Sequence, residues 1–143
     1  MTTSVSPLRE VLYRTLRDDT ALKAALGVPS VKPIAVFRGM AGSGVPKPYI
    51  SIGSMAEDPL ETFGKGHNSG TDTLHIWSAD VSDVEALTIY GHVERLLNRV
   101  QLVVTGFPVV SGVTRIIFCT QVFERSETST HCVVEYASLR VSA

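Results

Sequence analysis

Two prolines separated by a single lysine precede a run of residues that is typical of a β-strand. Pro46, Lys47 and Pro48 lead directly into Tyr-Ile-Ser-Ile, residues 49–52. Proline fixes its own φ and restricts the residue before it, so the chain has little freedom in how it enters the strand. A proline just outside a strand removes no hydrogen bond from the ladder. The sequence therefore predicts a strand over 49–56 whose direction is set by a stiff turn.

The segment after this strand is polar and rich in glycine. Residues 57–70, EDPLETFGKGHNSG, contain three glycines, one proline and charges of both signs, and their apolar content is little more than Leu60 and Phe63. This composition indicates a long mobile loop or an extended hairpin tip. A third strand is predicted over 71–78, with Leu74 and Ile76 on one face and His75 and Trp77 on the other.

The remaining elements follow from helical spacing, capping residues and apolar runs. The predicted elements are a helix over 7–26 that is capped by Ser6, interrupted or re-capped at Asp18-Asp19 and ended by Gly27; a short strand over 34–38; a helix between a cap at Ser82 or Asp83 and an end at Asn98–Arg99; a candidate short strand over 101–104; and late strands over 113–124 and 130–141. Antiparallel runs of strands favour the α+β class. We expect one domain over 1–143, a mostly antiparallel sheet packed by two helices, with a long inter-strand loop.

Composition excludes several classes of protein. Hydrophobic residues make up 44% of the 143 residues and charged residues 19%, which allows a core to form. The net charge of -1 gives no basic surface for nucleic acid. The apolar runs are too short to span a bilayer, and the N-terminus lacks the pattern of a signal peptide. The two cysteines, Cys119 and Cys132, are expected to be free thiols in a reducing cytosol.

No motif for catalysis, cofactor binding or metal binding is complete. Gly39 and Gly44 have the spacing of a phosphate-binding loop, but Val45 follows where a lysine is required. The histidines, at positions 67, 75, 92 and 131, form no pair with the spacing of metal ligands. The cysteines lie in apolar strands and are expected to be core residues. We therefore expect no catalytic residue, no cofactor and no metal site.

The order of segments along the whole chain resembles a family of phage proteins. Three features carry the resemblance: a leading helix that ends in D-x-x-L-x-x-x-L-G at Asp19–Gly27, the Pro-x-Pro-Tyr-Ile start of a strand at Pro46–Ile50, and the strand Leu-His-Ile-Trp-Ser at Leu74–Ser78 before a helix. Together they are similar to the small tail-completion proteins of long-tailed bacteriophages and related prophage elements, also called tail terminators or head-to-tail joining proteins. The stretch 101–112 is not matched to the family pattern.

The resemblance implies a structural protein without enzyme activity or cofactor. Such a subunit forms a ring, commonly of six copies, that ends the tail tube and meets the head connector. Its partners are then copies of itself, the tail-tube protein and the connector or neck proteins, with no nucleic acid and no membrane. The implied location is the head–tail interface of the virion tail, and the host cytoplasm during assembly.

The polar segment after the stiff turn is the predicted contact region. A segment of this length between two strands can reach a neighbouring subunit or the tail tube. The candidate contact residues are Glu57, Asp58, Leu60, Glu61, Phe63, Lys65 and His67. Exposed ion pairs contribute only about 0–1 kcal/mol each, so the apolar members are the candidates for affinity.

Two alternatives have different consequences. Another neck or head-completion component has a similar sequence at this level, and only its position in the particle distinguishes it. A small ligand-binding or hydrolase domain instead predicts a cavity lined by His75, Trp77 and Cys119, with converging titratable groups.

Overall fold

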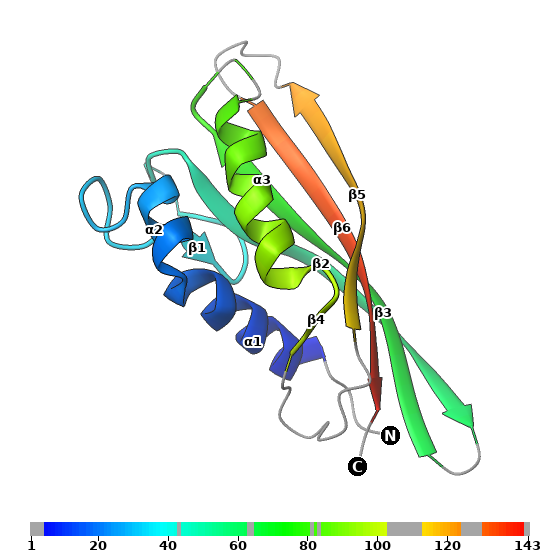
Figure 1. The fold of residues 1–143 in the computed structure, drawn as a ribbon. Helices are drawn as coiled ribbons and strands as arrows, with labels where there is room; N and C mark the ends of the chain where they lie inside the picture. The colour runs from blue at the N-terminus through cyan, green and yellow to red at the C-terminus, as the bar shows by residue number, and fades with distance from the viewer. Residues whose placement is uncertain are drawn as a thin grey trace.

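The structure is a computed structural model that describes residues 5–42, 44–62, 65–80, 82, 84–102, 113–123 and 130–141. The elements, in chain order, are α1 (Val5–Asp18), α2 (Thr20–Leu26), β1 (Val36–Phe37), β2 (Tyr49–Thr62), β3 (Lys65–Ser78), α3 (Val84–Leu97), β4 (Val100–Gln101), β5 (Val113–Phe123) and β6 (Thr130–Val141). Figure 1 shows how they are arranged. The predicted α+β class is confirmed.

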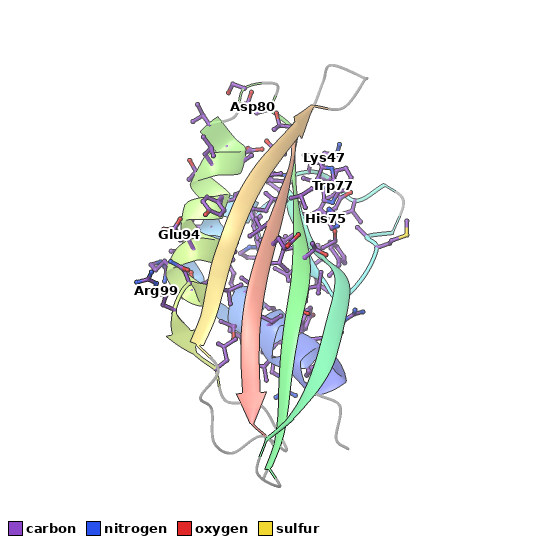
Figure 2. All side chains as sticks on the ribbon, turned by 90° about the vertical axis from the view of Figure 1, so that its right-hand side faces the viewer. Lys47, His75, Trp77, Asp80, Glu94 and Arg99 are labelled. Carbon is purple, nitrogen blue, oxygen red and sulfur yellow. The ribbon has the colours of Figure 1, made fainter. Side chains whose placement is uncertain are left out.

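The strands form one six-stranded sheet in the order β1-β2-β3-β6-β5-β4. β1 is parallel to β2, and the other neighbouring strands are antiparallel. The described helices lie on the same side of the sheet (Figures 1 and 2), and none of them covers the opposite side. We call that opposite side the helix-free face.

The predicted first helix is two helices, so the described chain has three helices instead of two. Asp19 separates them as the N-cap of α2, and its carboxylate accepts a 2.9 Å hydrogen bond from the N–H of Leu22. The same carboxylate pairs with Arg95 of α3 at 2.7 Å. Gly27 ends α2 with φ 79°, as the sequence predicts. Ser6 lies inside α1 and is not its cap.

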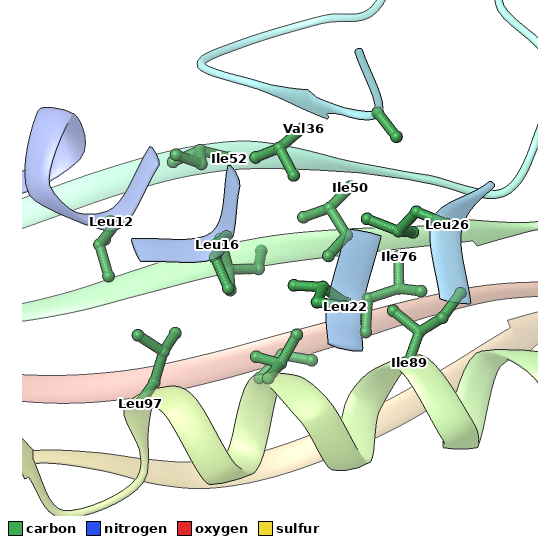
Figure 3. Packing of buried hydrophobic residues seen from close by; sticks show 14 of the residues in the cluster. Leu12, Leu16, Leu22, Leu26, Val36, Ile50, Ile52, Ile76, Ile89 and Leu97 are labelled. Atoms are coloured by element: carbon green, nitrogen blue, oxygen red, sulfur yellow. The ribbon is translucent and has the colours of Figure 1, made fainter. Parts of the chain in front are cut away.

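The core lies between the helices and the inner face of the sheet (Figure 3). Its largest fully buried side chains are Leu12, Leu16, Leu22, Leu26, Ile50, Leu74, Ile76, Ile89 and Leu97. On β3, Leu74 and Ile76 are buried while His75 and Trp77 are only half-buried, which confirms the predicted alternation. Each helix therefore contributes an apolar stripe to one layer, and each long inner strand contributes every second residue.

The prediction of a long inter-strand loop is wrong, and the alternative of an extended hairpin tip is correct. β2 and β3 continue through the polar segment in regular register, from Glu57 opposite Gly70 to Thr62 opposite Lys65. Only residues 63–64 lie between the two strands. The physical reason is tertiary: β6 pairs with β3 as far as His67 opposite Val141, so backbone hydrogen bonds stabilise strands that their composition does not favour.

A buried lysine fixes the turn that precedes β2. The side chain of Lys32 donates hydrogen bonds from Nζ to the carbonyl of Leu26 at 2.7 Å and to the carbonyl of Pro48 at 2.8 Å. Next to it, the N–H of Ile50 donates to the carbonyl of Ala35 at 2.8 Å. These bonds attach the end of α2 and the segment before β1 to the start of β2. The stiff turn is thus held in place by the helix layer.

Candidate functional site

The predicted contact residues lie at the far end of the β2–β3 hairpin. Glu57, Asp58, Leu60 and Glu61 are on β2, and Lys65 and His67 are on β3. The register brings Leu60 opposite His67, with Asp58 opposite Ser69. Phe63 lies outside the described residues. The sequence therefore pointed to one continuous contact segment. In the structure the β2 part of this segment pairs with its β3 part.

This end of the hairpin projects away from the helices. In Figure 1 the β2–β3 hairpin continues past the N-terminal end of α1, at the end of the molecule opposite the β3–α3 connection. β6 accompanies it as far as Val141, whereas β5 starts pairing with β6 only at Arg115 opposite Ala137. The segment is thus a narrow ribbon extending from the body of the subunit, held by backbone pairing.

A second group of residues gathers on the helix-free face. Tyr49, His75, Trp77 and His131, which we call the histidine–aromatic cluster, come from β2, β3 and β6. They meet because Tyr49 pairs with Trp77, and Trp77 pairs with His131, across neighbouring strands. Figure 2 shows His75 and Trp77 on this face, with Lys47 close by.

The rings of the cluster make specific contacts. Trp77 stacks on His131 with ring centroids 3.7 Å apart and an interplanar angle of 8°. Nδ1 of His75 is 2.8 Å from Nε2 of His131, so one of these nitrogens carries the proton that joins them. The indole N–H of Trp77 donates to the hydroxyl of Ser51 at 3.2 Å. The ammonium of Lys47 lies 5.6 Å from the centroid of the Trp77 ring.

Gly53 leaves space for the His75 ring. A Cβ atom at position 53 would lie 2.7 Å from Nε2 of His75 and 2.9 Å from the hydroxyl oxygen of Thr73. Cβ atoms do not come this close to other non-bonded atoms, so any larger residue at position 53 would force the side chains of His75 and Thr73 to shift. Burial lowers the pKa of His75 because the charged imidazolium loses solvation.

The neutral state of His75 predicts a loss of stability in mild acid. The folded protein takes up this proton at a lower pH than the unfolded chain, whose histidine titrates near 6.5. The free energy of unfolding should therefore be constant above this pH and fall as the pH drops below it. Urea unfolding at pH 7.5 and pH 5.5 measures the change, with His75→Asn as the comparison. A wild-type decrease no larger than that of His75→Asn would contradict the assignment.

The alternative of a ligand-binding or hydrolase domain predicts a cavity lined by His75, Trp77 and Cys119. A cavity of about 340 Å³ lies elsewhere, between α1, α2 and β1, with Tyr13, Leu16 and Ile34 among its lining residues. The side chain of Cys119 is outside the described residues. Cys132 is buried and packs in the core, as predicted.

The residues that the structure describes contain neither a metal-binding cluster nor a membrane-spanning helix. Within 5–42, 44–62, 65–80, 82, 84–102, 113–123 and 130–141, no three His, Cys, Asp or Glu residues are grouped so that they can hold a metal ion. None of the described helices has the length and apolar character of a transmembrane helix.

Sequence reasoning missed the pairing of His75 with His131. Both positions belong to strands that were predicted, and both face away from the core in an alternating pattern. Their contact depends on which strands are neighbours and in which register, and a single sequence does not specify this. The only local signal is that each histidine occupies an outward position next to apolar residues, with Leu74 and Ile76 beside His75 and Cys132 beside His131.

Comparison with known proteins decides the family. The family described as "Tail completion protein gp17" matches residues 10–139. The chain belongs to this family. As a tail-completion protein it is a structural component of a phage tail, and the resemblance stated from the sequence is confirmed.

The fold agrees with that of a solved virion component. A chain of the structure titled "Virion of native gene transfer agent (GTA) particle" aligns with a TM-score of 0.83 at 15% sequence identity, covering 100% of both chains. At this identity the likeness shows that the two chains have the same fold. No curated protein matches the chain.

Proposed function

We propose that this tail-completion protein, a single domain over 1–143, forms a ring of six copies at the end of the tail tube. The ring ends the tail and presents the surface to which the head connector joins. The observation that supports this most is the family match over residues 10–139. The protein acts at the head–tail interface after assembling in the host cytoplasm. Its role is structural, with no enzyme activity and no cofactor.

The shape of the subunit supports an assembly role. The β2–β3 hairpin extends beyond the helix layer, and backbone pairing with β6 stiffens part of it. An extension of this kind contributes little to the core of its own subunit but can reach another molecule. We assign the contact with a neighbouring subunit or with the tail tube to the hairpin end, which includes Glu57, Asp58, Leu60, Glu61, Phe63, Lys65 and His67.

Electron microscopy of the purified protein tests the ring. We expect annular particles with a mass of about six times the 15.5 kDa subunit, either in solution or after addition of tail tubes that lack this protein. The same tubes without added protein are the control. A protein that stays monomeric with and without tubes would contradict the proposal. Antibody labelling at the head vertex, with none at the tail end, would favour a head-completion role instead.

A further inference from the structure

The two outer edges of the sheet are open over most of their length. β1 pairs with β2 only at Ile50 and Ser51, and β4 pairs with β5 only at Val113 and Thr114. Among the described residues, no strand pairs with the outer edge of β2 over 52–62 or with that of β5 over 115–123. Long open edges expose unpaired backbone groups that attract another strand.

The directions of the two edge strands make them complementary. Each of the three pairings from β2 through β3 and β6 to β5 is antiparallel, so β2 and β5 run in opposite directions. A rotation about a ring axis carries β2 of one copy to the side of β5 of the next without reversing it. The new pair is therefore antiparallel and continues the pattern of the sheet. A closed ring needs two different surfaces that fit each other, and the two edges are such surfaces.

The positions of the open edges also fit a closed barrel. The midpoint of the β5 edge is Cys119, which pairs with Val134, then Leu74, then Ile52 across the sheet. The midpoint of the β2 edge is Glu57, which pairs with Gly70, four residues from Leu74, because a β-bulge lies between Ile52 and Met55. A stagger of four residues over the four long strands of one copy tilts the strands by about 35°, at the lower end of the range of closed barrels.

We infer that the outer edge of β2 in one copy pairs with the outer edge of β5 in the next, so that the ring contains one continuous β-barrel. This inference rests on the proposed ring. Because the helices thicken one side of each sheet, the barrel closes with the helix-free face inside (Figures 1 and 2). The occupant of each open edge is thus a second copy of this chain.

Pro59 shows where a substitution can block the pairing without breaking the fold. It lies opposite Asn68 inside β2 and has no N–H, so the N–H side at this position faces the outer edge. Alternate residues point their N–H groups to the same side, so that of Glu57 also faces outward. The substitution Glu57→Pro therefore removes a donor to the neighbouring copy and keeps the β2–β3 ladder. Glu57→Ala removes the carboxylate alone and is the matched control.

The test compares ring formation, in solution or on tail tubes, by wild type, Glu57→Pro and Glu57→Ala. The native Pro59 already leaves one gap among the outward donors of this edge. We expect Glu57→Pro to remain a folded subunit with wild-type circular dichroism and to form at least about tenfold fewer rings, because two prolines at alternate positions leave no outward N–H donor between residues 55 and 61. Glu57→Ala loses the carboxylate of a proposed contact residue but keeps the backbone donor, so it provides the baseline, and Glu57→Pro should form several-fold fewer rings than Glu57→Ala. Rings of Glu57→Pro at the wild-type level would overturn the inference and leave the proposed ring intact. Failure of the wild type to form rings, alone and on tubes, would overturn both.

Thiol cross-linking tests the same contact in intact rings. In the expected stagger Glu57→Cys lies opposite the native Cys119 of the next copy, with Cβ atoms about 5 Å apart, a separation that a short bifunctional thiol reagent bridges. Rings treated with this reagent should then give a ladder of covalent multimers on a denaturing gel. The control, Thr88→Cys on the exposed side of α3, should stay monomeric on the gel. Rings of Glu57→Cys that yield no more cross-linked species than Thr88→Cys would overturn the edge pairing.

Discussion

Replacing Lys32 with methionine is expected to destabilise the subunit by about 2–4 kcal/mol, a large part of the stability of a domain of this size. The side chain is 4% exposed, and its ammonium donates to the carbonyls of Leu26 and Pro48. Methionine has a similar volume but no donor, so both carbonyls lose a charged partner. The cost comes from these unsatisfied groups and not from lost apolar packing.

The burial of the ammonium limits the size of this effect. Loss of solvation lowers the pKa of Lys32, and the carboxylate of Glu85 partly opposes that shift. The folded state therefore bears a desolvation cost that methionine removes, which is why the expected loss is smaller than two isolated charged hydrogen bonds suggest.

Urea unfolding of the variant and of a matched control measures the effect. Lys23→Met changes a half-exposed lysine of α2 and is expected to stay within about 0.5 kcal/mol of wild type. If Lys32→Met also stays within that range, the two hydrogen bonds do not hold the turn before β2. A loss confined to Lys32→Met would show that the helix layer, and not the prolines alone, fixes the start of the hairpin.

Local signals in the sequence predicted the parts of the fold that local physics determines. Asp19 has a carboxylate that can cap the start of a helix, and Gly27 readily adopts the left-handed conformation that ends one. The structure places Asp19 at the start of α2 and Gly27 at its end. The predicted late strands, over 113–124 and 130–141, agree with β5 and β6 to within one residue. The alternation along β3 also predicted correctly which residues face the core.

Features that depend on distant partners were not predictable in the same way. The polar arms of the hairpin have the composition of a loop, and they are strands because they pair with each other and because β6 extends beside β3. His75 and His131 are 56 residues apart in the chain. Lys32 is followed by Pro33 in a segment with loop character, where a lysine is normally exposed. In each case the missing information is a neighbour that the tertiary fold brings close.

Shortening the β2–β3 hairpin is expected to leave a folded subunit that does not complete tails. The register allows an exact design: Asp58 and Ser69 are opposite each other, so replacing residues 59–68 with Asn-Gly joins them through a two-residue turn. The core residues that the structure describes lie outside the deleted segment. Thermal unfolding should therefore remain cooperative, while the ribbon beyond the helix layer is lost.

The functional loss should be large because the hairpin end carries the proposed contact. In complementation of a phage that lacks this chain, we expect the titre of infectious particles to fall by about hundredfold or more. That factor corresponds to about 3 kcal/mol of lost contact energy. Electron micrographs should show separate heads and tails. Infectious particles at the wild-type level would contradict the assignment of the hairpin end as a contact.

A single substitution and its control test the apolar contact of the hairpin end without shortening the hairpin. Phe63→Ser removes the largest apolar side chain of the hairpin end, and Met40→Ser removes an apolar side chain that is 97% exposed in another loop. Apolar burial provides most of the affinity of such contacts, so only Phe63→Ser should reduce the titre. Rings that form but do not bind tubes would assign the contact to the tail tube. Loss of the rings themselves would assign it to the neighbouring subunit, because a ring closes only through contacts between copies.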